Sequence, residues 1–88
     1  MNIMKPIILI YATDCWHSFA SREIIGIATT ENQRDRLIRQ YLREGESVSR
    51  KEIADAIDEI HRMGQTQCLA EKYDIEIDTE TVKKNTLL

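Results

Sequence analysis

The fold of this chain is decided by the stretch IILIYA at residues 7–12, which would carry apolar side chains on both faces of an extended strand. A short run rich in β-branched residues fits a strand better than a helix. The stretch EIIGIA at residues 23–28 has the same character. We therefore expect the two stretches to form a wide β-hairpin, with residues 7–12 in the centre of a sheet whose faces are both at least partly covered.

Two helices are expected next, each opened by a capping box, in which a Ser or Thr is followed three residues later by Glu or Gln. The boxes are Thr30 with Gln33 and Ser49 with Glu52. Apolar residues recur at helical spacing after each box, and a glycine ends each pattern. The first helix is thus predicted over about residues 31–44, and the second over the residues between its cap and Gly64.

A last strand is expected where the stretch YDIEID at residues 73–78 alternates apolar with acidic side chains, a pattern typical of a strand with one face in water. Residues 68–72 are ambiguous between a strand and a turn of helix, and the tail from about residue 79 is expected to fray. The two intervening helices suggest that the last strand runs parallel to the first, unless residues 68–72 reverse the chain. The sequence thus predicts one domain over residues 1–88, a small α+β fold in ββααβ order with a three-stranded sheet and two helices packed on one face.

Composition limits the kinds of partner that the chain can attract. The net charge of -3 gives no general attraction to nucleic acid or to anionic membranes, and no apolar run approaches the ~18 residues that a membrane span needs. Cys15 and Cys68 are far apart, so we expect reduced thiols in a cytoplasmic protein. Because two helices cover only one face of a sheet, the uncovered face is expected to support a homo-oligomer.

The hairpin loop, residues 14–22, contains the only Trp and the only Phe of the chain. Trp16 and Phe19 offer large apolar surface at a low entropy cost, His17 and Ser18 offer polar groups, and Arg22 offers a charged fork. This composition predicts a protein–protein interaction with an unknown partner through the loop, with these side chains as the binding residues. The alternative is that Trp16 and Phe19 fold back and close the open end of a small core.

The same loop also permits chemistry. Cys15 and His17 can form a thiolate–imidazolium pair, and together with His61 and Cys68 they match the ligand types of zinc. However, Cys15 and His17 lie in one short segment, whereas working pairs are usually held by separate rigid elements, and no glycine-rich stretch follows. A minimal enzyme or metal-binding protein centred on Cys15 and His17 is therefore the alternative hypothesis, and we expect no cofactor.

Nucleic-acid binding is suggested by the arginines of the predicted helix over residues 31–44. Residues 37–42 followed by 47–54 also resemble the first two helices of helix-turn-helix regulators. The chain departs from that pattern after Ala54, because residues 55–63 continue one helix and no recognition helix follows. Acidic residues dilute the basic face, so we expect a solvated helix surface with ion pairs, and nucleic-acid binding through residues 31–44 is a further alternative.

One further resemblance covers most of the chain. The stretch IYAT at residues 10–13, Trp16-His17-Ser18, the stretch IIGI at residues 24–27 and the polar helix start that follows resemble small uncharacterised ββα-type proteins of gut bacteria and their phages. The resemblance implies a hairpin, one or two helices and a closing strand. It implies no activity, substrate or site residue.

Overall fold

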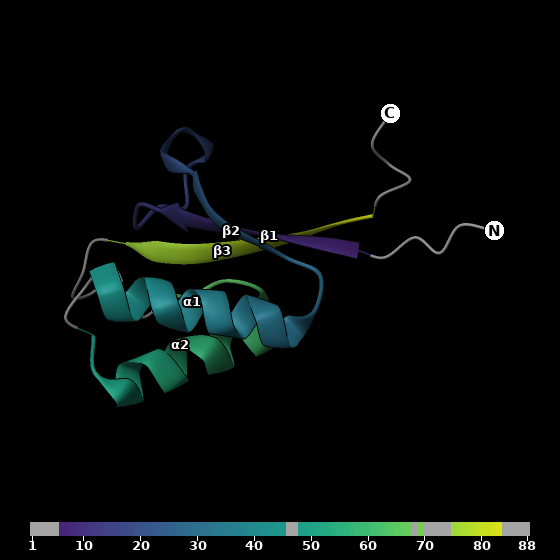
Figure 1. Cartoon of the computed structure of the whole chain (residues 1–88). Coiled ribbons are helices and arrows are strands. Elements are labelled where there is room, and N and C mark those ends of the chain that lie inside the picture. Colours follow the sequence, from purple (N-terminus) through teal and green to yellow (C-terminus); the bar gives the residue numbers. More distant parts are fainter. Residues whose placement is uncertain (1–5, 46–47, 68, 70–74, 84–88) are drawn as a thin grey trace.

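The computed structural model describes residues 6–45, 48–67, 69 and 75–83. The strands are β1 (Pro6–Thr13), β2 (Glu23–Ala28) and β3 (Glu76–Lys83), and the helices are α1 (Glu31–Gly45) and α2 (Arg50–Met63). A short 3-10 turn, Phe19–Ser21, lies in the hairpin loop. Both helices lie on the same side of the sheet, and the hairpin loop rises on the other side (Figure 1). The predicted α+β architecture in ββααβ order is confirmed.

β1 occupies the centre of a three-stranded sheet of order β2-β1-β3. It pairs antiparallel with both neighbours, so that Ile8 lies opposite Ala28 of β2 and Thr81 of β3. The expected parallel last strand is therefore wrong. The chain turns back directly after α2, where Gln65 forms an isolated antiparallel bridge with Asp78.

β3 lies further along the chain than the sequence pattern indicates. It pairs with β1 from Glu76, opposite Thr13, to Lys83, opposite Pro6, so the expected fraying from residue 79 is wrong for residues 79–83. These residues include Thr and Val, which favour strands, and β1 offers them an eight-residue partner. The start of the predicted strand and most of the ambiguous segment, residues 68 and 70–74, lie outside the described residues.

The helix ends follow from local chemistry. Ser49 Oγ accepts from the Glu52 backbone N–H at 3.1 Å, and Glu52 Oε1 accepts from the Ser49 N–H at 3.1 Å, which completes the predicted capping box. At the start of α1, Thr30 Oγ1 accepts from the Gln33 backbone N–H at 3.1 Å, which forms one half of the predicted capping box. The Gln33 side-chain Oε1 accepts from the Thr29 N–H at 2.9 Å, one residue earlier than the other half requires. Gly64 ends α2 in the left-handed conformation, with φ of 76°.

The core lies between the helices and one face of the sheet. Ile10 and Ile77 of the sheet are fully buried against the helical layer, which contributes Ile38, Leu42 and Ile60. A Cβ added at Gly26 would lie 3.1 Å from Leu37 Cδ1, so the missing side chain allows α1 to pack closely on β2. The opposite face of β2 remains open, since Ile27 is 60% exposed. Among the described residues no helix is both long and apolar enough to cross a membrane.

The two faces of the hairpin predict different costs for the same substitution. Ile10→Ala should lower the free energy of unfolding by about 2–5 kcal/mol, because it leaves a cavity in the closed core. Ile27→Ala, on the neighbouring strand, should cost less than about 1 kcal/mol because the side chain is already largely in water. Urea denaturation of both variants measures the difference, and equal losses would contradict this assignment of the two faces.

Candidate functional site

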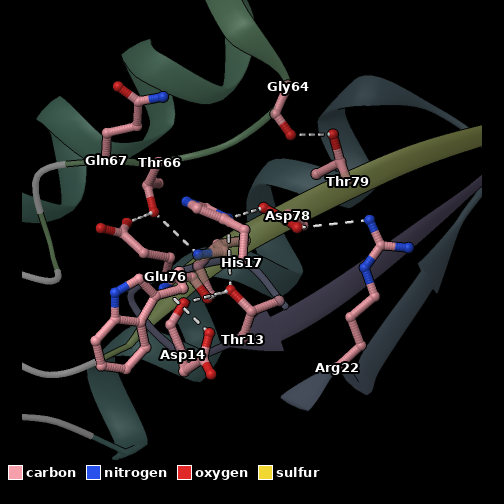
Figure 2. A network of polar contacts seen from close by, with 12 residues as sticks. Thr13, Asp14, His17, Arg22, Gly64, Thr66, Gln67, Glu76, Asp78 and Thr79 are labelled. Carbon is pink, nitrogen blue, oxygen red and sulfur yellow. Dashed lines mark hydrogen bonds and ion pairs between the residues drawn. The ribbon is translucent and has the colours of Figure 1, made fainter. Parts of the chain in front are cut away.

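Acidic side chains of β3 that were expected to face water are buried. Glu76 is 1% exposed and Asp78 is 4% exposed, although both point away from the helical layer. The expectation of a wet acidic face is wrong because other parts of the chain cover it. The two acidic residues and the residues that contact them form a group that we call the polar cluster (Figure 2). Its members are Thr13, Asp14, His17, Arg22, Thr66, Glu76 and Asp78.

Asp14 fixes the start of the hairpin loop through its carboxylate. Its Oδ1 accepts from the backbone N–H of Trp16 at 3.1 Å and of Ser18 at 3.2 Å, and its Oδ2 accepts from Ser18 Oγ at 2.9 Å. The Ser21 hydroxyl accepts from the Asp14 N–H at 3.0 Å and donates to the Ser18 carbonyl at 2.8 Å. The backbone N–H of Ser18 is the chief cause that holds the pKa of Asp14 below its ordinary value. The loop backbone is thus held by its own side chains.

His17 connects the loop to β3. It is the only non-glycine residue with positive φ (55°) in the described part of the chain, a left-handed conformation that costs roughly 1–2 kcal/mol. Its Nδ1 lies 2.5 Å from Asp78 Oδ1. Because an ionised carboxylate can only accept, Nδ1 is the donor in this contact. The contact to Asp78 stabilises the strained backbone at His17.

Arg22 holds the other end of the loop. Its guanidinium lies 3.5 Å from Asp78 Oδ2 and 3.7 Å from Glu80 Oε1, and 4.5 Å from the centres of the Tyr11 and Phe19 rings. The Tyr11 hydroxyl donates to Glu80 at 3.1 Å, and burial, followed by this contact, raises the pKa of Tyr11. Arg22 therefore places Phe19 by its ring contact and anchors the loop to two acidic residues of β3.

Thr66 completes the cluster from the segment that follows α2. Its hydroxyl donates a short hydrogen bond to Glu76 and accepts from the Ile77 N–H at 2.9 Å, and both Thr66 and Glu76 are buried. The segment GQTQ at residues 64–67 has the composition of a turn, and nothing else in its residues predicts a place in the cluster. The one available signal was the pair of acidic residues on one face of a predicted strand, which needs partners if that face is covered.

The predicted binding residues divide into two groups. Trp16 and Phe19 are 80% and 81% exposed, so they do not close the core. His17, Ser18 and Arg22 are half-buried. His17 contacts Asp78 of β3, and Ser18 donates to Asp14 within the loop. Of the five predicted binding residues, His17 and Arg22 thus belong to the polar cluster, and Ser18 contacts it through Asp14. Trp16 and Phe19 project into solvent.

The catalytic and metal alternatives use residues that the structure places apart. Cys15 is a free, half-buried thiol, and in the described part of the chain the polar contacts of the His17 ring are to Thr13 and Asp78. His61 Nε2 lies 2.8 Å from Asp35 Oδ2 in the helical layer. No group of three or more His, Cys, Asp or Glu suited to a metal occurs among the described residues, and Cys68 lies outside them.

The arginines of α1 differ in their exposure to solvent. Arg34 is buried, and its Nε donates to Asp35 at 3.0 Å, whereas Arg36, Arg39 and Arg43 are exposed. The arginine pattern that suggested nucleic-acid binding is thus divided between a buried ion pair and the helix surface.

Removing the shared acceptor of the cluster should release the loop. Asp78→Ala leaves His17 and Arg22 without this carboxylate, so we expect a loss of about 1–3 kcal/mol in the free energy of unfolding and faster amide exchange over residues 16–22. Asp55→Ala is the matched control, because Asp55 is exposed and its one ion pair within the described ranges is with Lys51, one helical turn away, for a cost of about 0.5 kcal/mol or less. Unchanged loop exchange in Asp78→Ala would contradict the anchoring role.

Acid should act on the loop through Asp14. A carboxyl whose pKa is lower in the folded than in the unfolded chain adds stability above its unfolded pKa, and this stability is lost as the pH falls through the folded pKa. We expect an NMR titration of the Asp14 carboxyl to show a midpoint below about 3.9, accompanied by shifts of the Trp16 and Ser18 amides. Asp14→Asn should abolish this step, and a midpoint at or above 3.9 would contradict the proposed hydrogen bonds.

Comparisons with models of protein families, with curated proteins and with solved structures find no match to this chain.

Proposed function

We propose that this protein acts by binding another protein through the hairpin loop, residues 14–22, with no chemistry of its own. The observation that supports the proposal is the exposure of Trp16 and Phe19, at 80% and 81%, on a loop whose backbone is held by hydrogen bonds. Large aromatic side chains dominate the binding energy of protein interfaces when they enter a pocket of the partner. The partner is therefore expected to offer an apolar pocket for each ring.

Preorganisation is what distinguishes this loop from a flexible connection. Binding costs about 0.5–1.5 kcal/mol for each rotamer-rich side chain that becomes ordered. Here Asp14 orders the loop backbone, and Arg22 already rests on the Phe19 ring before any partner arrives. The polar cluster beneath the loop thus reduces the entropy cost of binding.

A second candidate is self-association through the open face of the sheet. It is favoured by the exposure of Ile24 and Ile27 on β2, which lie on the same side of the sheet as the loop. A second copy seated there would cover the apolar face that the helices leave free. Light scattering distinguishes the two candidates, since self-association gives a mass that increases with concentration and decreases in Ile24→Glu.

Site-specific photo-crosslinking tests binding through the loop. A benzophenone side chain in place of Phe19 should crosslink to one partner protein in native lysate, and the variant with Trp16→Ala added should lose the crosslink while retaining its unfolding free energy. The matched control carries the benzophenone in place of Met63, which is also exposed but lies at the end of α2.

The partner is then purified and its affinity is measured directly. We expect Trp16→Ala to weaken binding by at least about tenfold, as truncation of a central aromatic residue does, and Met63→Ala to leave it within about twofold. Equal crosslinking from positions 19 and 63, or an affinity insensitive to Trp16, would refute the proposal.

A further inference from the structure

The helical layer contains a second surface with the features of a binding site. A groove of about 570 Å³ lies between the C-terminal half of α1 and the first turns of α2. Its floor is aliphatic, formed by Val48, Ile53, Ala54 and Ile57, and three arginines border it. The helices that line the groove lie on the opposite side of the sheet from the hairpin loop (Figure 1), so the groove does not belong to the site proposed above.

The three arginines come from both walls of the groove. Arg39 and Arg43 lie one helical turn apart on α1, about 6 Å along its axis, and Arg50 begins α2 on the other side. None of the three has an acidic partner among the described residues. The groove thus brings three arginines together in a chain whose net charge is -3.

Acidic residues near the groove are occupied elsewhere. Glu44 accepts from the Gln40 side chain, Glu52 caps Ser49 at the start of α2, and Asp55 pairs with Lys51. In the described part of the chain these carboxylates thus leave the three guanidinium groups without an acidic partner, so the guanidinium groups can bind an external anion. Arginine forks bind carboxylates in a bidentate geometry, which is stronger than the contact of a single point charge.

We infer that this groove binds an acidic peptide segment of a partner protein, with carboxylates on the three arginines and an aliphatic side chain on the floor. Arginines on both walls match several separate anions better than the single head group of a small molecule. The groove is also open, whereas small-molecule sites bury most of their ligand. Among the described lining residues none is aromatic, so the groove lacks the stacking surfaces on which single-stranded nucleic acid depends.

The test uses a phage-displayed library of random peptides panned against the full-length protein. Enriched peptides should contain Asp or Glu flanking Leu, Ile or Val. One enriched peptide, synthesised with a fluorescein label, should bind in fluorescence anisotropy with an affinity that decreases as sodium chloride is added, because the contacts are ionic. Enrichment of peptides without acidic residues, no enrichment, or an affinity indifferent to salt would overturn the inference.

Matched variants locate the binding. Arg39→Gln/Arg43→Gln should weaken binding of the labelled peptide by about tenfold, whereas Arg36→Gln/Arg62→Gln, which removes the same charge from exposed positions outside this groove, should change it by less than about twofold. Glutamine keeps the helix propensity, and thermal unfolding followed by circular dichroism checks that both variants fold. Equal losses in the two variants would refute the site.

Two controls separate this inference from its competitors. Trp16→Ala/Phe19→Ala should bind the labelled peptide as the wild type does, so failure of the loop hypothesis and failure of the groove hypothesis are distinguishable. A single-stranded oligonucleotide is the competing occupant. If it binds more tightly than the peptide and loses its affinity in Arg39→Gln/Arg43→Gln, the acidic-peptide assignment is wrong.

Discussion

The pairing of β1 along both of its edges is the constraint on which the other parts of this fold depend. β1 pairs with β2 and β3, and Ile8 and Ile10 on one of its faces pack against the helices. The hairpin loop leaves β1 directly after Thr13 and returns to β2 at Glu23, so it is tied to one end of the sheet. Because the helices fill one side, this loop must lie over the end of the sheet on the side that they leave open (Figure 1).

That placement explains the buried acidic residues of β3. Taking a carboxylate out of water is costly unless hydrogen bonds and opposite charges compensate it. Asp78 is compensated by His17 and Arg22 of the loop, and Glu76 by Thr66 from the segment after α2. Buried ion pairs of this kind add little net stability compared with apolar packing. When one partner moves away, however, the other charge stays buried without compensation, which is strongly destabilising. The cluster therefore fixes one conformation of the loop rather than adding much to the stability of the fold.

Features that depend on neighbouring residues could be predicted, and features that depend on distant contacts could not. The capping box of Ser49 and the strand character of residues 23–28 are local, and the structure contains both. Over the described residues 75–78, the alternation correctly indicated which side chains share a face, but it cannot say what covers that face. The contact between His17 and Asp78 joins residues that are 61 positions apart, and it reverses the expected exposure of the acidic face. The exposure of Trp16 and Phe19 depends on the same long-range contacts.

The hairpin loop contains several unfavourable features. His17 occupies a left-handed conformation, Arg22 Nε is buried without a hydrogen-bond partner among the described residues, and the two largest aromatic side chains of the loop are in water. A loop that only joined two strands would be a short turn with none of these costs. Strained backbone and unsatisfied polar groups that the surrounding structure holds in place cluster at functional sites of proteins. The ordered loop with exposed aromatic side chains therefore supports our proposal that this loop is a binding surface.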